Sequence, residues 1–235
     1  MGSSISNVPH RCNVTIQEAI DIQLWLRARV RIEHVPVKLS TIGIIHIDSA
    51  PPCSWPDIAT CTITTCSYPS LDVLVSTTRS STTLYMYDPD TIAFRYLPMV
   101  IGALDDIEYD LLLVNSSGAS HVRRLGVASH IGVIVNKPTI GVTTSLESCS
   151  SIHDNDIVMD SEVIEWSKEA TNMAKRLKLQ VPYTTKVYDN IVGRAVKHNG
   201  TVYYVSPGHM ITVQKAAEIV SYICKKSPII METYL

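Results

Sequence analysis

The stretch Gly118–Val142, which reads GASHVRRLGVASHIGVIVNKPTIGV, organises the expected fold. It follows a short apolar run, Asp110–Val114, that is typical of a buried strand. From Ser120 the apolar residues recur at helical spacing, and Pro138 ends that pattern because a proline cannot continue a helix. Thr139–Val142 is again a short apolar run. The stretch therefore predicts a strand–loop–helix–strand unit.

Two arginines stand where the helix of this unit is expected to begin. Arg123 and Arg124 follow a loop rich in glycine and serine. A helix N-terminus presents backbone N–H groups that bind anions, and arginine adds paired donors that suit a phosphate. The pattern fits a phosphate-binding site. An ordinary βαβ unit with two solvated arginines explains the same residues equally well.

The same stretch resembles the most distinctive sequence block of the endonuclease V family. Two weaker blocks fall in the matching order, one similar to F-R-E-x-P and one similar to S-P-G-H. The resemblance extends from roughly Ser40 to Lys226. The blocks read SHVRRLGVASH at residues 120–130 with KPTIGV at 137–142, FRYLP at 94–98, and VSPGH at 205–209.

This resemblance implies both a fold and an activity. The fold is α/β, with a ribonuclease H-like mixed β-sheet flanked by helices, and the order of strands and helices read from the sequence agrees with it. Members of the family are Mg²⁺-dependent hydrolases associated with DNA repair. They recognise deaminated adenine (inosine) in DNA or RNA and nick the strand 3′ to it. The expected partner is therefore single- or double-stranded nucleic acid.

Composition limits where such a partner could bind. The chain has 235 residues, of which 46% are hydrophobic and 18% charged, so we expect a packed globular protein. A net charge of −2 provides no global attraction for nucleic acid, so any binding must use a local site. The six cysteines form no C-x-x-C pair and indicate reduced thiols, hence a cytoplasmic or nuclear protein. No apolar run reaches membrane-spanning length, so no membrane association is expected.

We expect one endonuclease V-like domain over residues 1–235, in four segments. These are an N-terminal helix at 14–33, a central sheet with helices at 40–145, a loop and an extra helix at 146–189, and a hairpin and helix at 190–228. Thr15–Glu18 is a capping box that opens the first helix, which is expected to run to about Ile32 with Ile16, Ala19, Ile20 and Leu24 on its apolar face. The hairpin is expected to turn at Lys197–Gly200. The expected strands are Thr41–Ile47, Ile58–Cys66, Leu71–Thr77, Ile191–Val196 and Thr201–Val205, and the expected later helices are Thr91–Leu104 and Thr212–Cys224.

The extra helix is predicted at Glu162–Leu179, with lysines and an arginine on its polar side. This segment is longer than the family resemblance leads us to expect. A solvated surface helix explains it, and so does a binding surface for a protein partner through residues 162–179.

The resemblance also indicates where a catalytic Mg²⁺ would bind. The family uses an Asp after the first strand, the Glu of F-R-E, an Asp after the fourth strand and a Lys after the fifth. Asp48 is the best match for the first of these, although a shift of register would place His46 or Ile45 there. The other three positions are Tyr96, Asn115 and Thr144.

Only one carboxylate of the family's set is therefore kept, which predicts a poor Mg²⁺ site and a weak or inactive nuclease. Asp110 cannot replace Asn115, because five residues along a strand place it about 16 Å away. The remaining alternative is a carboxylate from a loop, such as Asp57, Asp88 or Asp90. Asp48 and Asn115 are the weak candidate metal ligands.

Two histidines match family positions near the scissile phosphate. They are His121 and His209, and with Asp48 they complete the candidate catalytic residues. A mechanism that relies on these histidines without a metal is conceivable.

The residues expected to recognise the nucleic acid match the family better than the expected catalytic residues do. Tyr87 matches a tyrosine that fills the gap left by a displaced base, although a tyrosine anchoring a turn explains it nearly as well. Gly126 and Val127 match part of the family's base pocket. The other two glycine positions of that pocket hold Asp90 and Ser116, whose side chains would narrow the pocket or change its charge. The further candidates for nucleic-acid binding are Arg123, Arg124, Ser129, His130 and Gly208.

Several of these residues have plain structural explanations. Gly118, Gly126 and Gly141 allow close packing of a helix on strands. His130 lies on the expected helix, where a histidine is more often part of the core than a ligand. Three hypotheses about function remain open: a divergent nuclease, a catalytically inactive protein that still binds nucleic acid, and a scaffold subunit of a larger assembly.

Overall fold

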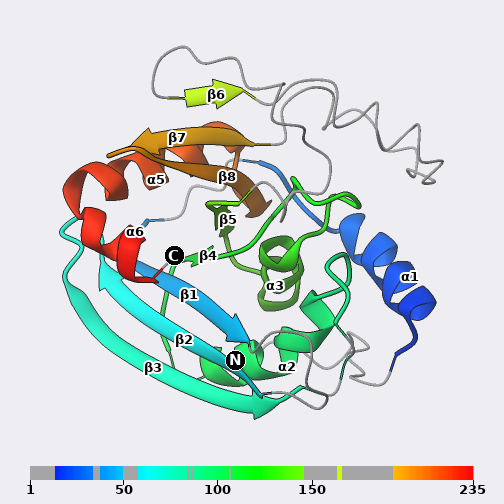
Figure 1. Cartoon of the computed structure of the whole chain (residues 1–235). Coiled ribbons are helices and arrows are strands. Elements are labelled where there is room, and N and C mark those ends of the chain that lie inside the picture. Colours follow the sequence, from blue (N-terminus) through cyan, green and yellow to red (C-terminus); the bar gives the residue numbers. More distant parts are fainter. Residues whose placement is uncertain are drawn as a thin grey trace.

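The structure is a computed structural model that describes residues 14–33, 38–49, 58–83, 85, 87–105, 107–145, 163–165 and 193–234. In these residues eight strands form one mixed sheet in the order β3-β2-β1-β4-β5-β8-β7-β6 (Figure 1). The elements are α1 Ile16–Arg27, β1 Thr41–Ser49, β2 Ile58–Ser67, β3 Val73–Thr82, α2 Ala93–Leu104, β4 Leu111–Val114, α3 Val127–Val135, β5 Thr139–Thr143, β6 Val163–Glu165, β7 Arg194–His198, β8 Thr201–His209, α5 Val213–Lys226 and α6 Pro228–Tyr234.

The middle of the sheet consists of parallel strands, and its flanks are antiparallel. β1 pairs parallel with β4, and β4 pairs parallel with β5. On one side β2 and β3 add antiparallel strands, and on the other side β8, β7 and β6 do the same. The carboxyl ends of β1, β4 and β5 therefore meet at one edge, where sheets of this kind bind ligands. The predicted mixed α/β sheet is confirmed.

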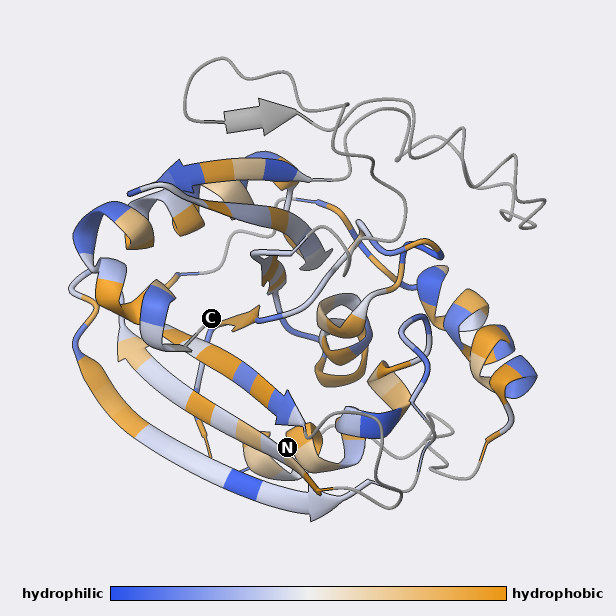
Figure 2. Cartoon of the chain, viewed as in Figure 1, coloured by the Kyte–Doolittle hydropathy of each residue, from blue (hydrophilic) through white to orange (hydrophobic). Residues whose placement is uncertain are grey.

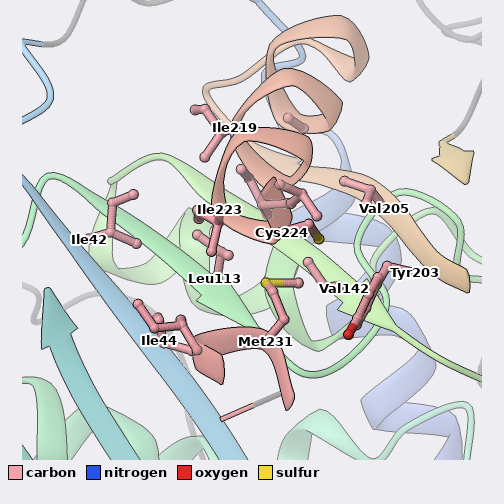
Figure 3. Close-up of a cluster of buried hydrophobic side chains, with 14 of the residues drawn as sticks. Ile42, Ile44, Leu113, Val142, Tyr203, Val205, Ile219, Ile223, Cys224 and Met231 are labelled. Atoms are coloured by element: carbon pink, nitrogen blue, oxygen red, sulfur yellow. The ribbon is translucent and has the colours of Figure 1, made fainter. Parts of the chain in front are cut away.

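Two helices, α5 and α6, cover one face of the sheet. Figure 3 shows their apolar side chains, among them Ile223 and Met231, against Ile44 of β1 and Leu113 of β4. These four side chains are at most 1% exposed. Thr212 starts α5, because its side chain accepts a hydrogen bond from the N–H of Lys215 at 3.2 Å.

The opposite face packs against α2 and α3. Alternate residues of β1 and β4, such as Ile45 and Leu112, point into this second core. Figure 2 shows α3 coloured mostly as hydrophobic, which agrees with its burial between the sheet and α1. The two-sided cover explains why Leu111–Val114 is a continuous apolar run.

The hairpin of β7 and β8 has the turn that the sequence predicted. Asn199 and Gly200 both adopt positive φ, 47° and 86°, as a two-residue hairpin turn requires. β8 continues to His209, beyond the expected end at Val205, and its pairing with β5 is irregular between Thr139 and Ile140. The last helix, α6, was not expected from the sequence.

The N-terminal helix begins as predicted but ends earlier. Thr15 and Glu18 form the capping box, whereas α1 stops at Arg27 and not near Ile32. The reason lies in tertiary contacts: the N–H of Arg31 donates to His209 Nδ1 at 3.2 Å, and its carbonyl accepts from the N–H of Met210 at 2.6 Å. These bonds hold the segment after α1 extended along the end of β8.

The central helix starts later than the apolar pattern suggested. α3 begins at Val127, not at Ser120. The preceding residues form turns, in which the N–H of His121 bonds to Gly118 O at 3.2 Å and the N–H of Arg124 bonds to His121 O at 2.7 Å. Arg124 has a φ of 58°, which an α-helix cannot continue.

The predicted helix Glu162–Leu179 is wrong at its start. Val163–Glu165 is strand β6, which pairs antiparallel with Arg194–Val196 of β7. In these three residues, pairing with β7 at the edge of the sheet therefore outweighs the helical pattern of the sequence. The rest of that segment, and with it the expected partner surface, lies outside the described residues. Within the described ranges, no helix is long and apolar enough to cross a membrane.

Candidate functional site

A cavity of about 410 Å³ lies at the carboxyl ends of the parallel strands. Ile47 of β1, Asn115 after β4 and Ser145 after β5 all contribute to its wall. The remaining wall comes from Gln23 of α1, from the loop that leads into α2 and the start of α2, and from the loop that leads into α3 and the first residue of α3. The cavity therefore forms where the family resemblance predicts the active site.

One wall consists of closely packed backbone. A Cβ atom on Gly126 would lie 2.2 Å from Ser117 O, so no other residue fits there without movement. The N–H of Gly126 donates to Gly118 O at 3.0 Å, and the N–H of Ala128 donates to Ser117 O at 3.1 Å. Gly141 is equally constrained, because its Cβ would lie 2.5 Å from Ser116 O. These contacts support the packing role expected for the glycines, and they place Gly126 and Val127 in the cavity wall.

Arg123 points inward, not toward solvent. Its Nε donates to Gln23 Oε1 at 2.6 Å, its Nη2 donates to the carbonyl of Asp90, and its Nη1 lies 3.9 Å from Asp90 Oδ2. The side chain is 9% exposed, and burial lowers the pKa of its guanidinium. Arg124 donates to Ala119 O at 3.3 Å. The expected phosphate site at a helix N-terminus is therefore not formed here, since α3 begins three residues beyond Arg124.

His121 is a neutral side chain in the cavity wall. Burial, and then the charge of Arg123, lower its pKa to about 3, while the contact with Asp90 acts in the opposite direction. Its Nδ1 accepts a hydrogen bond from the N–H of Arg123 at 3.2 Å, so we assign the ring proton to Nε2. Nε2 lies 3.9 Å from Asp90 Oδ1. His121 thus offers an N–H donor beside a carboxylate.

The residues that the resemblance matched to the family's catalytic positions do not form a charged cluster. Asp48 is exposed and does not line the cavity, because Ile47 points to that side and successive side chains of a strand alternate. Asn115 lines the cavity, and its Oδ1 accepts from the N–H of Ile47 at 2.9 Å. The hydroxyls of Tyr96 and Ser49 lie 2.9 Å apart. Thr144 is exposed and outside the lining.

His209 lies away from His121. It pairs with Thr139 at the start of β5, whereas the cavity is at the other end of that strand. Burial and the charge of Arg31 lower its pKa to about 4. The structure therefore does not bring the two candidate phosphate contacts together at the cavity.

Three further candidates are buried in the packing. His130 is 0% exposed and its ring meets Phe94 edge-on, with centroids 5.1 Å apart. Ser129 is also 0% exposed. A Cβ on Gly208 would lie 2.2 Å from Thr139 Oγ1. None of the three lines the cavity. Tyr87 does line it, and its side chain is 43% exposed.

The comparisons with known proteins agree with this geometry. A sequence model of the family described as Endonuclease V matches residues 26–233. The chain belongs to the endonuclease V family. The endonuclease V of Gloeobacter violaceus is 28% identical over 220 residues, which cover 92% of this chain and 81% of that protein.

Solved endonuclease V structures share the fold. That of Streptomyces avermitilis has a TM-score of 0.72 at 24% identity and covers 92% of this chain and 87% of its own. That of Ciona intestinalis, in complex with a 24mer DNA containing an inosine followed by a ribo-adenosine, has a TM-score of 0.64 at 22% identity, with 88% of each chain covered. The resemblance and the ribonuclease H-like fold inferred from the sequence are confirmed.

Endonuclease V enzymes are generally metal-dependent nucleases, and the residues of this homologue do not fit a Mg²⁺ site. In the part of the chain that the structure describes, no three His, Cys, Asp or Glu side chains are grouped closely enough to hold a metal. Asp90 brings one carboxylate to the cavity, and Asn115 an amide. Mg²⁺ prefers more carboxylate oxygens than this set contains. Asp57 lies outside the described residues.

The other loop carboxylate, Asp88, has a structural role. Its Oδ1 accepts hydrogen bonds from the N–H groups of Asp90 at 2.8 Å and Thr91 at 3.1 Å. This interaction closes the turn before α2 and holds Asp90 next to the cavity. Asp110, at the opposite end of β4, similarly accepts from the N–H groups of Ser40 and Thr41 at 2.7 and 2.9 Å. Its exclusion as a substitute for Asn115 is confirmed.

A polar residue that connects two parts of the site, Gln23, was not expected from the sequence. Gln23 is 1% exposed and connects Arg123 to the carbonyl of Asp90, to which its Nε2 donates at 2.8 Å. A signal for it existed, because Gln23 follows the buried Ala19 by four residues and so lies on the same face of α1. Ile16, expected on the buried face, is 41% exposed.

Proposed function

We propose that this endonuclease V homologue binds a nucleotide base, turned out of a DNA or RNA strand, in the cavity at the carboxyl ends of β1, β4 and β5. It recognises deaminated adenine there and cleaves the strand weakly or not at all. The observation that supports this proposal is the contrast within one cavity: its backbone wall at Gly126 is closely packed, whereas Tyr96 and Asn115 stand where the resemblance places charged residues of the family.

The cavity has the properties that a displaced base requires. It is lined by the backbone-rich segment at Gly126 and Val127, by the aromatic ring of Tyr87, and by the donor His121. Single bases are bound by stacking on aromatic rings and by hydrogen bonds to their edges. A fold relative from Ciona intestinalis forms a complex with inosine-containing DNA, which supports nucleic acid as the ligand here.

The same residues argue against efficient cleavage. Hydrolysis of a phosphodiester develops negative charge that a bound Mg²⁺ would offset, and the loss of such stabilisation lowers the rate by a factor of about 100 or more. Tyr96 directs its hydroxyl to Ser49 and Asn115 directs its amide to the backbone of Ile47. Both side chains are thus bonded to the end of β1 and carry no charge.

A gel series tests the proposal. Labelled single strands with a central inosine, as RNA and as DNA, are incubated with excess protein and Mg²⁺ or Mn²⁺, then run on native and denaturing gels beside strands with adenine. We expect an inosine-dependent shift without cleavage. Cleavage one nucleotide beyond the inosine would overturn the proposed inactivity. No shift with any strand would overturn nucleic-acid binding.

A second candidate function is a divergent nuclease that uses Asp90. The observation in its favour is the carboxylate of Asp90, 3.9 Å from Nε2 of His121 in the same cavity. In that case metal-dependent cleavage appears in the gel series and disappears in Asp90→Ala, while Asp48→Ala, a change outside the cavity, leaves it intact. Loss of cleavage in Asp48→Ala instead would assign the metal to the family's first position.

A further inference from the structure

Strand β3 forms one edge of the sheet, and no strand in the described part of the chain pairs with its outer side. Figure 1 shows it as the outermost strand, at the bottom of the view. All of its residues are exposed except Thr77, which is half-buried. An unpaired edge presents a row of backbone N–H and C=O groups that another strand can bind. β3 therefore has the geometry of a surface for strand pairing.

The edge lacks the features that usually prevent such pairing. Natural edge strands carry lysine, proline or inward-pointing charges, or are bent by bulges. Val73–Thr82 contains no lysine, proline or acidic residue, and Arg79 is its single charged residue. Its pairing with β2 is regular from Val75 to Thr82 and shifts register only at the start of the strand. The edge is thus straight enough, and neutral enough, to pair.

Cross-strand hydroxyl pairs hold β3 in line with β2. Their oxygen–oxygen distances are 3.0, 3.1 and 2.9 Å for Thr60–Ser80, Thr62–Thr78 and Thr64–Ser76. Hydrogen-bonded pairs of this kind stabilise antiparallel strands. An edge that is already ordered loses little conformational freedom when a further strand binds to it.

The start of β3 adds an apolar surface between two charges. Val73, Leu74 and Val75 are 52%, 57% and 46% exposed, and Figure 2 shows this end of the strand coloured as hydrophobic. Covering such side chains is favourable because it removes apolar area from water. Asp72 precedes them and Arg79 follows them, and both residues are exposed. The edge therefore carries a negative charge at its start and a positive charge further along.

We propose that β3 joins two copies of this chain, which pair antiparallel about a two-fold axis at Ser76. In this register Ser76 faces Ser76 of the second copy. Arg79 lies opposite Val73 of the second copy and within reach of Asp72 next to it, so that each copy supplies the charge opposite to that of the other. An axis at Arg79 would instead set two arginines against each other. The opposite charges therefore select a second copy of this chain, in one register, as the partner.

The arrangement is a closed contact, because both copies use the same surface in a two-fold pair. Pairing covers the apolar start of β3 in both copies and satisfies the outward backbone groups of both strands. The inference is independent of the proposed function, since no residue of β3 lines the cavity.

The test measures the mass of the full chain in solution by size-exclusion chromatography with light scattering. At about 100 µM protein, a dissociation constant of about 10 µM leaves most chains paired, so we expect a mass near twice 26.0 kDa. Ser76→Lys and Ser76→Asp should each raise the dissociation constant at least about tenfold, because like charges then face each other across the axis. An equimolar mixture of the two variants should pair again, since a lysine then faces an aspartate.

The matched control is Gln17→Lys, which adds the same charge at an exposed position of α1 and should leave the mass unchanged. Recovery of the dimer in the mixture shows that both Ser76 variants are folded. Hydrogen exchange gives a second measurement: the backbone amides of β3 should exchange slowly in the dimer and faster in Ser76→Lys alone.

A mass of 26.0 kDa for the unmodified chain at this concentration overturns the proposal. A dimer that both Ser76 variants leave intact places the contact on another surface and also overturns it. So does a mixture that fails to pair although circular dichroism shows both variants folded. A monomer whose β3 amides exchange slowly would mean that another segment of the same chain covers the edge, which equally rules out the second copy.

Discussion

The glycine-rich wall of the cavity and the polar side chains beside the end of β1 line one site but differ in what holds them. Gly126 in the wall, and Gly118 and Gly141 in the packing next to it, each face a backbone atom that a Cβ would approach to 2.5 Å or less. Tyr96 of α2 and Asn115 after β4 make hydrogen bonds to residues near the end of β1. Where backbone atoms pack this closely, no residue other than glycine fits without movement. A charged side chain, in contrast, can be replaced by an uncharged one that forms hydrogen bonds with its neighbours. Fold and catalytic chemistry can therefore separate within one site.

The largest effect is expected in the wall. Gly126→Ala forces a Cβ to within 2.2 Å of Ser117 O, a backbone atom that cannot rotate away. We expect a loss of about 3 kcal/mol in the free energy of unfolding, measured by urea denaturation. Gly102→Ala is the matched control, because nothing lies within 4 Å of its added Cβ, and it should stabilise α2 by up to about 1 kcal/mol. Equal stability of the two variants would show that the wall is not constrained by packing.

A comparable effect is expected at the inner arginine. Arg123→Leu removes, in a buried place, the donor to Gln23 Oε1 and one of the two donors to the carbonyl of Asp90. The free energy of unfolding should fall by about 2 to 3 kcal/mol in thermal or urea denaturation. Base binding should weaken too, since Asp90 loses one of its supports.

The control for that change is Arg29→Ala, whose side chain stacks on the exposed Trp25 of α1, 3.3 Å from the ring centroid. It should cost less than about 1 kcal/mol. Should Arg123→Leu weaken strand binding strongly without loss of stability, Arg123 would be a direct phosphate contact after all.

The dependence of the free energy of unfolding on pH should reveal the lowered pKa of His121. Its pKa falls from 6.5 to about 3 in the folded protein, so between these values the unfolded chain binds the additional proton. Stability should therefore rise with pH by up to about 1.4 kcal/mol per unit across that window and then level off above pH 6.5.

His121→Gln should remove this part of the slope in urea denaturation at a series of pH values. A parallel His209→Gln variant should remove a similar part, because burial lowers the pKa of that histidine to about 4. An unchanged slope in His121→Gln would mean that the ring is already solvated in the folded chain.

The smallest effect concerns the strand ends. In the double variant Tyr96→Glu, Asn115→Asp, two carboxylates join Asp90 around the cavity. We expect Mg²⁺ at ten times its dissociation constant to stabilise this variant by about 1.4 kcal/mol, seen as a rise in Tm. The unmodified chain should show no such rise, and neither should the variant with K⁺ in place of Mg²⁺. A Mg²⁺-dependent rise in the unmodified chain would show that the present residues already form a metal site.

Much of the fold could be predicted from local patterns. The capping box at Thr15, the turn at Asn199-Gly200 and the apolar run Leu111–Val114 lie where the sequence placed them. The start of α3 could not be predicted in this way. The apolar spacing begins at Ser120, but the loop before Val127 is held in turns by bonds to the neighbouring strand segment, such as that from the N–H of Ala119 to Pro207 O at 2.8 Å.

The sequence by itself determined the family and the mixed sheet, because both follow from residue types in a fixed order. The tertiary structure alone decided the direction in which each charged side chain points. Arg123 turned out to be buried, Asp48 faces away from the cavity, and Asp90 faces into it. The physical reason is that the direction of a side chain at a strand end or in a loop depends on which neighbours fix its backbone. Those neighbours come from α1 and β8, at opposite ends of the chain.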